Sequence, residues 1–392
     1  MMRHLSASLF VFVLAAVPAS AQEPVTLGQV FALDSKVMQE PRRVIVWTPP
    51  GYDNGRARVP VLYLTDAERQ FAHTVTTVEF LSRNGRAPAM LVVGIFNTDR
   101  ARDLTPYKDG TEETDTRLPT SGGADRFLQF VETELVPWVE SRYRTEPFRL
   151  FAGHSFGGLF AVHAMATRPG LFNAVISVSP TLGWRQGEPS RRMERMLAGH
   201  RAVKASLYVT LGEEGDVMQS GFDRMKAVLE QHANPNLRWH MVSMKEEDHG
   251  SIVLRSHYNG IEAIFEGWQM PRSADAPSAG LDAVEAHYRK VSDRLGWTVL
   301  PSEPTVNQLG YAALLGKNVA EAVALFRLNV ANYPDSANAY DSLGEGLEAS
   351  GQLRAALENY EEAVKRGDAS SDPGLAEFRR HRDALRQKLG AP

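Results

Sequence analysis

The most informative pattern in this chain of 392 residues lies in the segment Phe148-Arg-Leu-Phe-Ala-Gly-His-Ser-Phe-Gly-Gly158. Its apolar start predicts a buried strand over residues 149–152, and the alanine- and leucine-rich continuation predicts a helix over residues 159–167. The G-x-S-x-G turn between them is typical of a nucleophile elbow, in which flanking glycines avoid clashes and the serine Oγ stands clear of the sheet. Ser155 is therefore the expected nucleophile, although a tight turn with an incidental serine would show the same letters.

Changes in composition divide the chain into parts. Residues 22–272 alternate short β-rich runs with helical segments, whereas no convincing strand follows the polar, proline-bearing joint at residues 271–278. The expected strands cover residues 43–47, 59–64, 89–95, 149–152, 174–178, 206–211 and 237–244. Near-continuous apolar strands separated by helices indicate an α/β fold, with a mostly parallel sheet and helices on both faces.

An internal repeat marks the C-terminal part, residues 300–392. One constant spacing relates Leu309-Gly310 to Leu343-Gly344, Ala322 to Ala356 and Phe326 to Tyr360. Because this spacing matches the tetratricopeptide period of about 34 residues, the sequence predicts two helical repeats followed by a capping helix over residues 375–389. The arginines within residues 379–386 are expected to face water. The residues expected to be largely buried by stacking are Leu309, Tyr311, Phe326, Tyr340, Leu343 and Tyr360.

A linker with a bridging helix is expected between the two parts, over residues 273–299, with the helix at residues 281–295. Two repeats are fewer than the three that usually stand alone, so a generic helical tail is the alternative interpretation. For the same reason we expect the repeats to dock against the larger part, with a possible protein partner on their free surface.

The N-terminus has the features of a secretory signal peptide over residues 1–21. Arg3 precedes the apolar run Leu5 to Val17, which is too short to span a bilayer, and Ala19-Ser-Ala21 supplies the small-residue cleavage pattern. We therefore expect cleavage near Ala21 and export to the periplasm or the medium. The chain has no cysteine, which excludes disulfides, thiolate metal sites and cysteine nucleophiles. Its net charge of −4, without a long basic run, gives no support for nucleic-acid binding.

A serine needs a base to become a nucleophile, so one of the eleven histidines should reach Ser155. His249 is the best candidate because it lies in a polar loop, residues 245–250, between the last expected strand and a helix. That loop falls at the same carboxyl edge of the sheet as the elbow. His240 lies inside a strand, His257 lies two turns into a helix, and His154 should point away from its neighbour Ser155.

An acid that orients the base is expected in the loop after strand 206–211. That strand runs into Gly212-Glu213-Glu214-Gly215-Asp216, whose three acids all fall at the required edge. Glu214 is the preferred candidate, followed by Glu213 and then Asp216. The two acids that do not orient the base are expected to be ordinary solvated carboxylates of the loop.

An acyl transfer also needs two N–H donors for the developing oxyanion. One should be the backbone amide of Phe156, directly after the serine. The second should come from the loop after strand 59–64, with the amide of Glu68 preferred and that of Ala67 as the alternative. Neither side chain is expected to take part.

Four motifs stand out along the chain: Gly153-His-Ser-Phe-Gly-Gly158, Asn97-x-x-Arg100-x-Arg102-Asp103-Leu-Thr-Pro106, Glu247-Asp-His-Gly-Ser251, and Gly51-Tyr52 after two prolines. In these motifs the chain resembles the esterase D / enterochelin-esterase-like branch of the α/β-hydrolases. The resemblance covers about residues 26–268, and tetratricopeptide extensions are familiar in that branch. It departs at Asp66-Ala67, where relatives usually have Asp-Gly.

The resemblance implies a serine esterase that acts on carboxylic esters through Ser155, Glu214 and His249, without a metal or other cofactor. Some members of the branch cleave siderophore trilactones, and others cleave small acyl esters or thioesters. An acyltransferase with the same residues, and a binding protein with a vestigial site, are the alternative functions.

Three residues are candidates for contacts with the small-molecule substrate. Arg100 and Arg102 could hold an anionic or catecholate group, because a guanidinium gives planar, bidentate recognition. Arg102 could instead pair with Asp103 and pin its loop. Trp184 follows strand 174–178 at the active edge, where it would line the acyl pocket or pack in the core.

Overall fold

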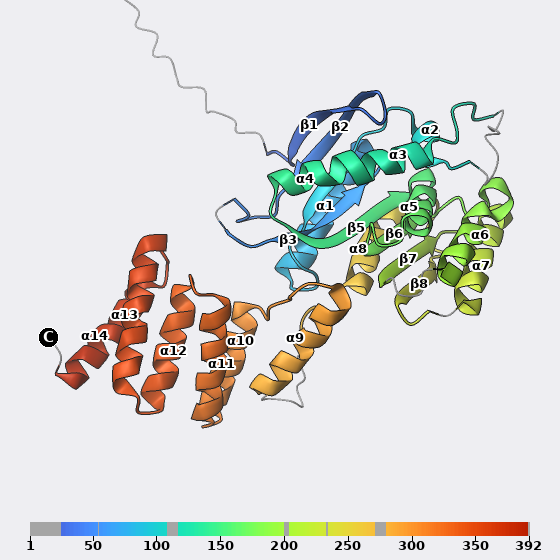
Figure 1. Ribbon diagram of the computed structural model, residues 1–392. Coiled ribbons are helices and arrows are strands. Elements are labelled where there is room, and N and C mark those ends of the chain that lie inside the picture. The colour runs from blue at the N-terminus through green and yellow to red at the C-terminus, as the bar shows by residue number, and fades with distance from the viewer. Residues whose placement is uncertain are drawn as a thin grey trace, which may run out of the picture.

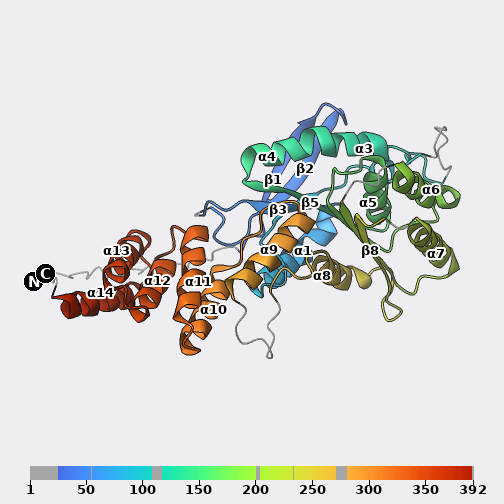
Figure 2. The ribbon, with the colours of Figure 1, turned by 60° about the horizontal axis from the view of Figure 1, so that its bottom comes forward.

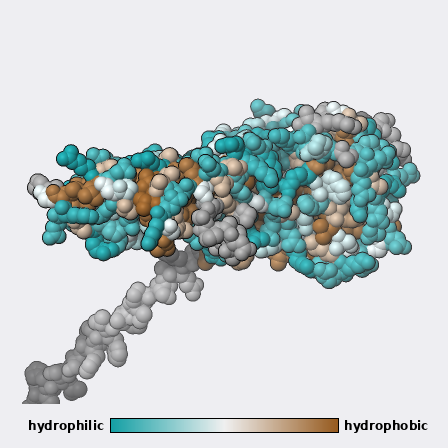
Figure 3. Space-filling model, turned by 90° about the horizontal axis from the view of Figure 1, so that it is seen from below, coloured by the Kyte–Doolittle hydropathy of each residue, from teal (hydrophilic) through white to brown (hydrophobic). Residues whose placement is uncertain are grey.

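The computed structural model describes residues 25–53, 55–107, 117–199, 204–232, 234–270 and 280–390. The expected signal peptide and the whole of the expected joint at residues 271–278 lie outside these ranges. A sheet-containing part is followed by a narrower row of helices (Figure 1), which gives the molecule its elongated outline in the space-filling view (Figure 3). Among the described residues, no helix combines the length and the apolar character that a membrane crossing requires.

One eight-stranded sheet forms the centre of the larger part, in the order β1-β2-β4-β3-β5-β6-β7-β8. The first two pairings, β1 with β2 and β2 with β4, are antiparallel, and the remaining ones are parallel. The carboxyl ends of the parallel strands therefore meet at one edge. The strands are β1 (Gln29–Ser35), β2 (Glu40–Trp47), β3 (Val59–Leu64), β4 (Leu91–Ile95), β5 (Thr145–His154), β6 (Ala174–Val178), β7 (Ala205–Leu211) and β8 (Leu237–Ser243).

The sequence predicted every strand except β1. The edge strand β1 is mostly exposed, so it lacks the continuous apolar run by which the others were recognised. The buried strand β3 has the bounds that its apolar run predicts.

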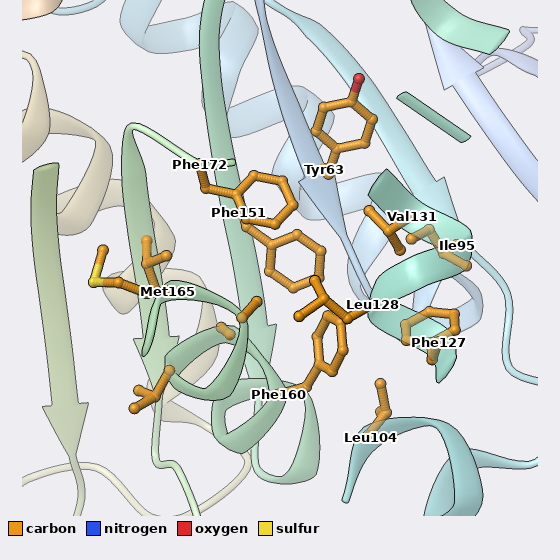
Figure 4. Packing of buried hydrophobic residues seen from close by; sticks show 14 of the residues in the cluster. Tyr63, Ile95, Leu104, Phe127, Leu128, Val131, Phe151, Phe160, Met165 and Phe172 are labelled. Carbon is orange, nitrogen blue, oxygen red and sulfur yellow. The ribbon is translucent and has the colours of Figure 1, made fainter. Parts of the chain in front are cut away.

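Helices cover both faces of the sheet, as expected. One face carries α3 (Ala124–Phe130), a π-turn (Val131–Leu135), α4 (Val136–Arg142), α5 (Phe156–Thr167), α6 (Trp184–Gly199) and α7 (Asp216–Gln231). The other face carries α1 (Ala67–Arg83) and α8 (Ile252–Ile264), and the short α2 (Arg100–Leu104) follows β4. Aromatic rings pack between the sheet and the helices on the face that carries α5 (Figure 4). Phe151 of β5 lies 5.4 Å from Phe160 of α5 and 4.9 Å from Phe172, measured between ring centroids.

The helical region starts with α9 (Leu281–Leu295), which has the bounds that the sequence predicted and lies between the sheet-containing part and the later helices (Figure 2). The remaining helices are α10 (Glu303–Leu315), α11 (Val319–Asn332), α12 (Ala337–Ala349), α13 (Leu353–Ser370) and α14 (Leu375–Leu389). Phe148 of β5 lies 5.0 Å from Trp297, which follows α9, between ring centroids. The buried face of α9 belongs to the same hydrophobic cluster as α8, so the two parts share one core.

The internal repeat has a structural counterpart. A Cβ built on Gly310 would lie 2.4 Å from the Phe326 ring, and one built on Gly344 would lie 2.5 Å from the Tyr360 ring. In both helical hairpins, glycine therefore lets an aromatic ring from the next helix approach the backbone. The expected burial is only partly right: Phe326, Leu343 and Tyr360 are buried, whereas Leu309, Tyr311 and Tyr340 are half-buried.

Polar partners at the surface explain the incomplete burial. The Tyr311 hydroxyl donates to Glu345 at 2.8 Å, and the Arg366 guanidinium lies over the Tyr340 ring at 4.1 Å. The arginines of α14 differ in exposure. Arg379 and Arg380 are exposed, as the sequence predicted, whereas Arg382 and Arg386 are half-buried.

Candidate active site

Ser155 occupies the turn between β5 and α5 with φ 61° and ψ −114°, a conformation that a non-glycine residue rarely adopts. Its backbone N–H donates to the Val178 carbonyl of β6 at 2.9 Å. A Cβ on Gly153 would lie 2.2 Å from the Gly157 carbonyl oxygen, and one on Gly157 would lie 2.4 Å from Thr65 Oγ1. Larger residues would therefore clash on both sides of the turn, which is why the strained serine is flanked by glycines.

The structure brings one acid and one histidine together beside this turn. His249 Nδ1 is hydrogen-bonded to one carboxylate oxygen of Glu214, whose side chain is only 5% exposed. The other oxygen accepts hydrogen bonds from the Ser179 hydroxyl and from the Gly212 amide, the latter at 3.1 Å. These bonds hold the buried carboxylate in place against the imidazole.

The competing acids and histidines lie elsewhere. Glu213 and Asp216 are exposed, and neither is recorded in contact with His249 among the described residues. His240 is exposed on β8, and His257 is buried in α8.

His154, which was expected to point away from the serine, takes part in the site. Its Nε2 lies 2.6 Å from the backbone carbonyl oxygen of His249, and the two rings are 4.6 Å apart. Burial, assisted by the nearby His249, lowers the pKa of His154, which keeps its ring neutral. Sequence reasoning missed this role because the partner lies 95 residues away, although the position inside the G-x-S-x-G turn was a signal.

The candidate oxyanion donors start two helices at the same edge of the sheet. Phe156 is the first residue of α5, and Ala67 and Glu68 are the first two residues of α1. Backbone amides in the first turn of a helix have no acceptor within that helix. Asp66, directly before α1, is left-handed with φ 56°, so the loop between β3 and α1 turns sharply here. Glu68 and Ser155 line the same cavity.

Arg100 links the α1 loop to the elbow. Its Nε and Nη2 donate to the two carboxylate oxygens of Asp66 at 2.6 and 3.0 Å, and Nη2 also donates to the His154 carbonyl at 3.1 Å. Asn97 donates to Asp66 at 2.7 Å and to the Glu68 carboxylate at 2.6 Å. The buried Asp66 was missed as a site residue by sequence reasoning, although its place two residues after β3, at the edge that carries the elbow, was a signal.

The structure does not bring Arg102 or Trp184 to this cavity. Arg102 donates to Asp103 at 2.7 Å, as its alternative interpretation expected, and also pairs with Glu40. Trp184 is buried, donates from Nε1 to the Pro106 carbonyl at 2.9 Å and packs edge-on against Phe156 at 5.7 Å between ring centroids. The indole therefore packs against the first residue of α5 and stabilises its position.

The cavity at the elbow has a volume of about 890 Å³. Arg69 is exposed on it, and no acidic partner is recorded for its guanidinium in the described part of the chain. Its lining residues are Asp66, Glu68, Arg69, Gln70, His73, Asn97, Thr98, Arg100, His154, Ser155, His249, Gly250, Ser251, Val253 and Leu254. Of the described residues, one group has the spacing of metal ligands, Asp341, Glu345 and His381, and it lies in the helical region.

Several known proteins are similar to this chain in sequence and in fold. The chain is 34% identical over 154 residues to the ferri-bacillibactin esterase BesA of Bacillus subtilis, covering 35% of this chain and 50% of that protein. It is 28% identical over 178 residues to a siderophore enterobactin esterase of Emericella nidulans, covering 40% of this chain and 56% of that protein. The chain thus spans about half the length of these curated relatives.

A solved structure extends the likeness. The IroE-like serine hydrolase of Shewanella oneidensis superposes with a TM-score of 0.67 at 27% identity, covering 77% of this chain and 98% of that one. The family described as "Putative esterase" matches residues 35–255, more than half of the chain, with β2 to β8 and the elbow inside the match. The chain therefore belongs to this esterase family, on an α/β-hydrolase fold.

Proposed function

We propose that this protein is a serine esterase that hydrolyses carboxylic esters through Ser155, His249 and Glu214. The observation that carries the proposal is that His249, whose Nδ1 is bonded to the buried Glu214 carboxylate, lines the same cavity as the strained elbow serine. With Nδ1 donating to the carboxylate, His249 Nε2 is the atom left to accept the serine proton. Membership in an esterase family supports the same chemistry.

The proposed reaction passes through an acyl-enzyme. Ser155 Oγ attacks the ester carbonyl while His249 takes its proton, and the imidazolium then protonates the alcohol that leaves. A water molecule, activated by the same histidine, releases the acid and restores the serine. The backbone amides of Phe156 and Glu68, or Ala67 in place of Glu68, would stabilise the oxyanion, each contributing about 2.7–4 kcal/mol.

We further propose that the substrate carries an anionic or catecholate group, as a siderophore-type ester does. Two of the relatives named above are a ferri-bacillibactin esterase and a siderophore enterobactin esterase, which supports this class. Arg69 supplies an exposed guanidinium on the cavity, whereas Arg100 is already engaged by Asp66 and Arg102 lies away from the lining. Arg69 is thus our candidate for the anionic group, and Arg100 is assigned a positioning role.

The experiment that tests the esterase proposal uses Ser155→Ala and a fluorophosphonate probe. The variant should fold normally but lose turnover of a nitrophenyl ester by about 10³-fold or more, because the other residues of the triad cannot replace the nucleophile. The probe should label Ser155 alone in the native protein. Labelling of another residue, or full turnover by Ser155→Ala, would refute the proposal. A panel of siderophore, feruloyl, acetyl-xylan and nitrophenyl esters then identifies the acyl group.

For the remaining parts we propose tetratricopeptide-like packing and export. The glycine–aromatic contacts, which recur at the same place in both hairpins, support two tetratricopeptide-like repeats capped by α14, with α9 as the neighbour on their other side. The charge and apolar run of residues 1–21 support an export signal that is removed near Ala21. N-terminal sequencing of the protein from its native host tests the second proposal directly.

A further inference from the structure

A second cavity, of about 350 Å³, lies where α9 meets the sheet. It is lined by Phe148 near the start of β5, by Ala205 at the start of β7 and by Arg238 at the start of β8. The catalytic cavity lies at the opposite ends of these parallel strands, so the two cavities are separate. Figure 2 shows α9 alongside the sheet-containing part at this junction.

Two arginines that line this cavity also carry buried donors without a partner among the described residues. Nε and Nη2 of Arg294, on α9, are inaccessible to solvent and have no hydrogen-bond partner within the described chain, and the same holds for Nη1 of Arg238. The second amino group of Arg238 donates to Glu266 at 2.7 Å. Buried charged donors without an acceptor are costly and uncommon in folded proteins. Burial and the charge of Arg238 lower the pKa of Arg294, as expected where a cation lacks an anion.

Two lysines increase the positive charge of the same cavity. Lys204 donates to the backbone carbonyl of Asp293 at 3.3 Å, which holds its ammonium group at the rim. Lys290, one turn before Arg294 on α9, is exposed, and no carboxylate partner is recorded for it among the described residues. Against these four cations, the lining contains one acidic residue, Asp293. The cavity thus has an excess of positive charge.

We propose that this cavity binds a small anion that carries carboxylate or phosphate groups and bridges Arg294 of α9 and Arg238 of β8. Planar guanidinium groups suit the paired oxygens of both chemical groups, and the volume suits a small metabolite. Because the two arginines belong to different parts of the molecule, the ligand would fasten the helical region to the sheet-containing part. It would stabilise the whole chain without touching Ser155.

The test measures thermal unfolding and calorimetric binding of the full-length protein with citrate and with inorganic phosphate. Sodium chloride at the same ionic strength is the reference, so that general screening is subtracted. We expect at least one of the two probes to bind in the calorimetric titration, which separates binding from the general stabilisation that excluded anions such as phosphate give to folded proteins. Binding to citrate alone identifies a carboxylate ligand, and binding to phosphate alone identifies a phosphorylated one.

Matched variants locate the binding. Arg294→Gln should weaken the affinity about tenfold or more, because charge-assisted hydrogen bonds are lost. Arg289→Gln removes the same charge from an exposed position of α9 outside the cavity, and it should bind as the native protein does. If Arg294→Gln fails to fold, the double variant Lys204→Gln/Lys290→Gln, at two exposed positions, takes its place. Its control is Arg289→Gln/Arg327→Gln.

Two results would overturn the proposal. One is that neither citrate nor phosphate binds in the calorimetric titration. The other is that the cavity variants bind as tightly as their charge-matched controls, which would show that the anion binds elsewhere.

Discussion

His154 Nε2 lies 2.6 Å from the backbone carbonyl oxygen of His249. A carbonyl oxygen can only accept a hydrogen bond, so Nε2 carries the proton and donates it. The residue before the elbow serine thereby holds the loop that carries the candidate base. Because burial lowers the pKa of His154, the ring stays neutral and does not repel the imidazolium that forms on His249 during the proposed reaction.

Replacing His154 should therefore slow the reaction without preventing substrate binding. His154→Phe keeps a ring but loses the donor, and we expect kcat to fall by about 10- to 100-fold with little change in KM. His154→Gln retains an N–H donor and should recover part of the loss. The rate at which a fluorophosphonate labels Ser155 should fall in parallel. If only KM changed and labelling stayed at the native rate, His154 would be a substrate contact instead.

The three acids of the loop after β7 should differ sharply in importance. Glu214→Gln should reduce turnover of a nitrophenyl ester by roughly 10²- to 10⁴-fold, because the amide favours the wrong tautomer of His249. Glu213→Gln and Asp216→Asn are the matched controls, since both side chains are exposed and should be nearly neutral. If Glu213→Gln lost turnover while Glu214→Gln kept it, the acid that orients His249 would be Glu213.

Residues that follow a strand could be placed from the sequence, and residues held by distant partners could not. Strand ends put Ser155, Glu214 and His249 at one edge of the sheet, and the structure brings the last two into contact. The clamp between Asp66 and Arg100 joins segments 34 residues apart, and no local periodicity reports such a pairing. The contact of Arg102 with Glu40 spans 62 residues and was missed for the same reason.

The charge on Arg69 should matter for anionic esters alone. Arg69→Gln should raise KM for a siderophore-type ester by about tenfold, because a charged hydrogen bond is lost, and should leave nitrophenyl acetate almost unaffected. Arg83→Gln, on the same helix but outside the catalytic cavity, is the control. Equal losses on the charged and the neutral ester would indicate a structural role for Arg69.

Stability should depend on pH through His257. The ring is fully buried, and its Nδ1 bonds the Thr74 hydroxyl at 2.9 Å. Burial, with smaller contributions from His73 and His154, lowers the pKa of His257 to about 3. Between pH 3 and the ordinary histidine pKa of about 6.5, the unfolded chain binds the proton that the folded chain excludes. The free energy of unfolding should therefore fall with decreasing pH in this window, by up to about 1.4 kcal/mol per pH unit from this residue.

Urea unfolding of the native protein and of His257→Gln, from pH 4.5 to 7.5, measures this contribution. The variant should lose stability at neutral pH but show a shallower slope below pH 6.5. The exposed His240→Gln serves as the control. Parallel slopes for the native protein and His257→Gln would show that His257 does not carry the dependence.

The stability of the sheet-containing part should depend on where the chain is truncated. The described residues that line the cavity at the elbow end at Leu254, so the helical region supplies none of them. The core does depend on α9, because Trp297 packs on Phe148 and the side chains of Val284, Val291 and Leu295 are buried in the same cluster as Phe265. Removing α9 would expose several apolar side chains, each worth about 1.5–3 kcal/mol when fully buried.

A chain that ends at residue 300 should therefore fold and retain turnover of a small nitrophenyl ester, whereas a chain that ends at residue 272 should be much less stable. Circular dichroism melts and nitrophenyl ester assays of both chains, against the full-length protein, measure the difference. Equal stability of the two truncated chains would mean that α9 contributes little to the core. The chain that ends at residue 300 keeps every described residue that lines the cavity at the elbow. If it folded but had lost turnover, α10–α14 would be needed to build the active site.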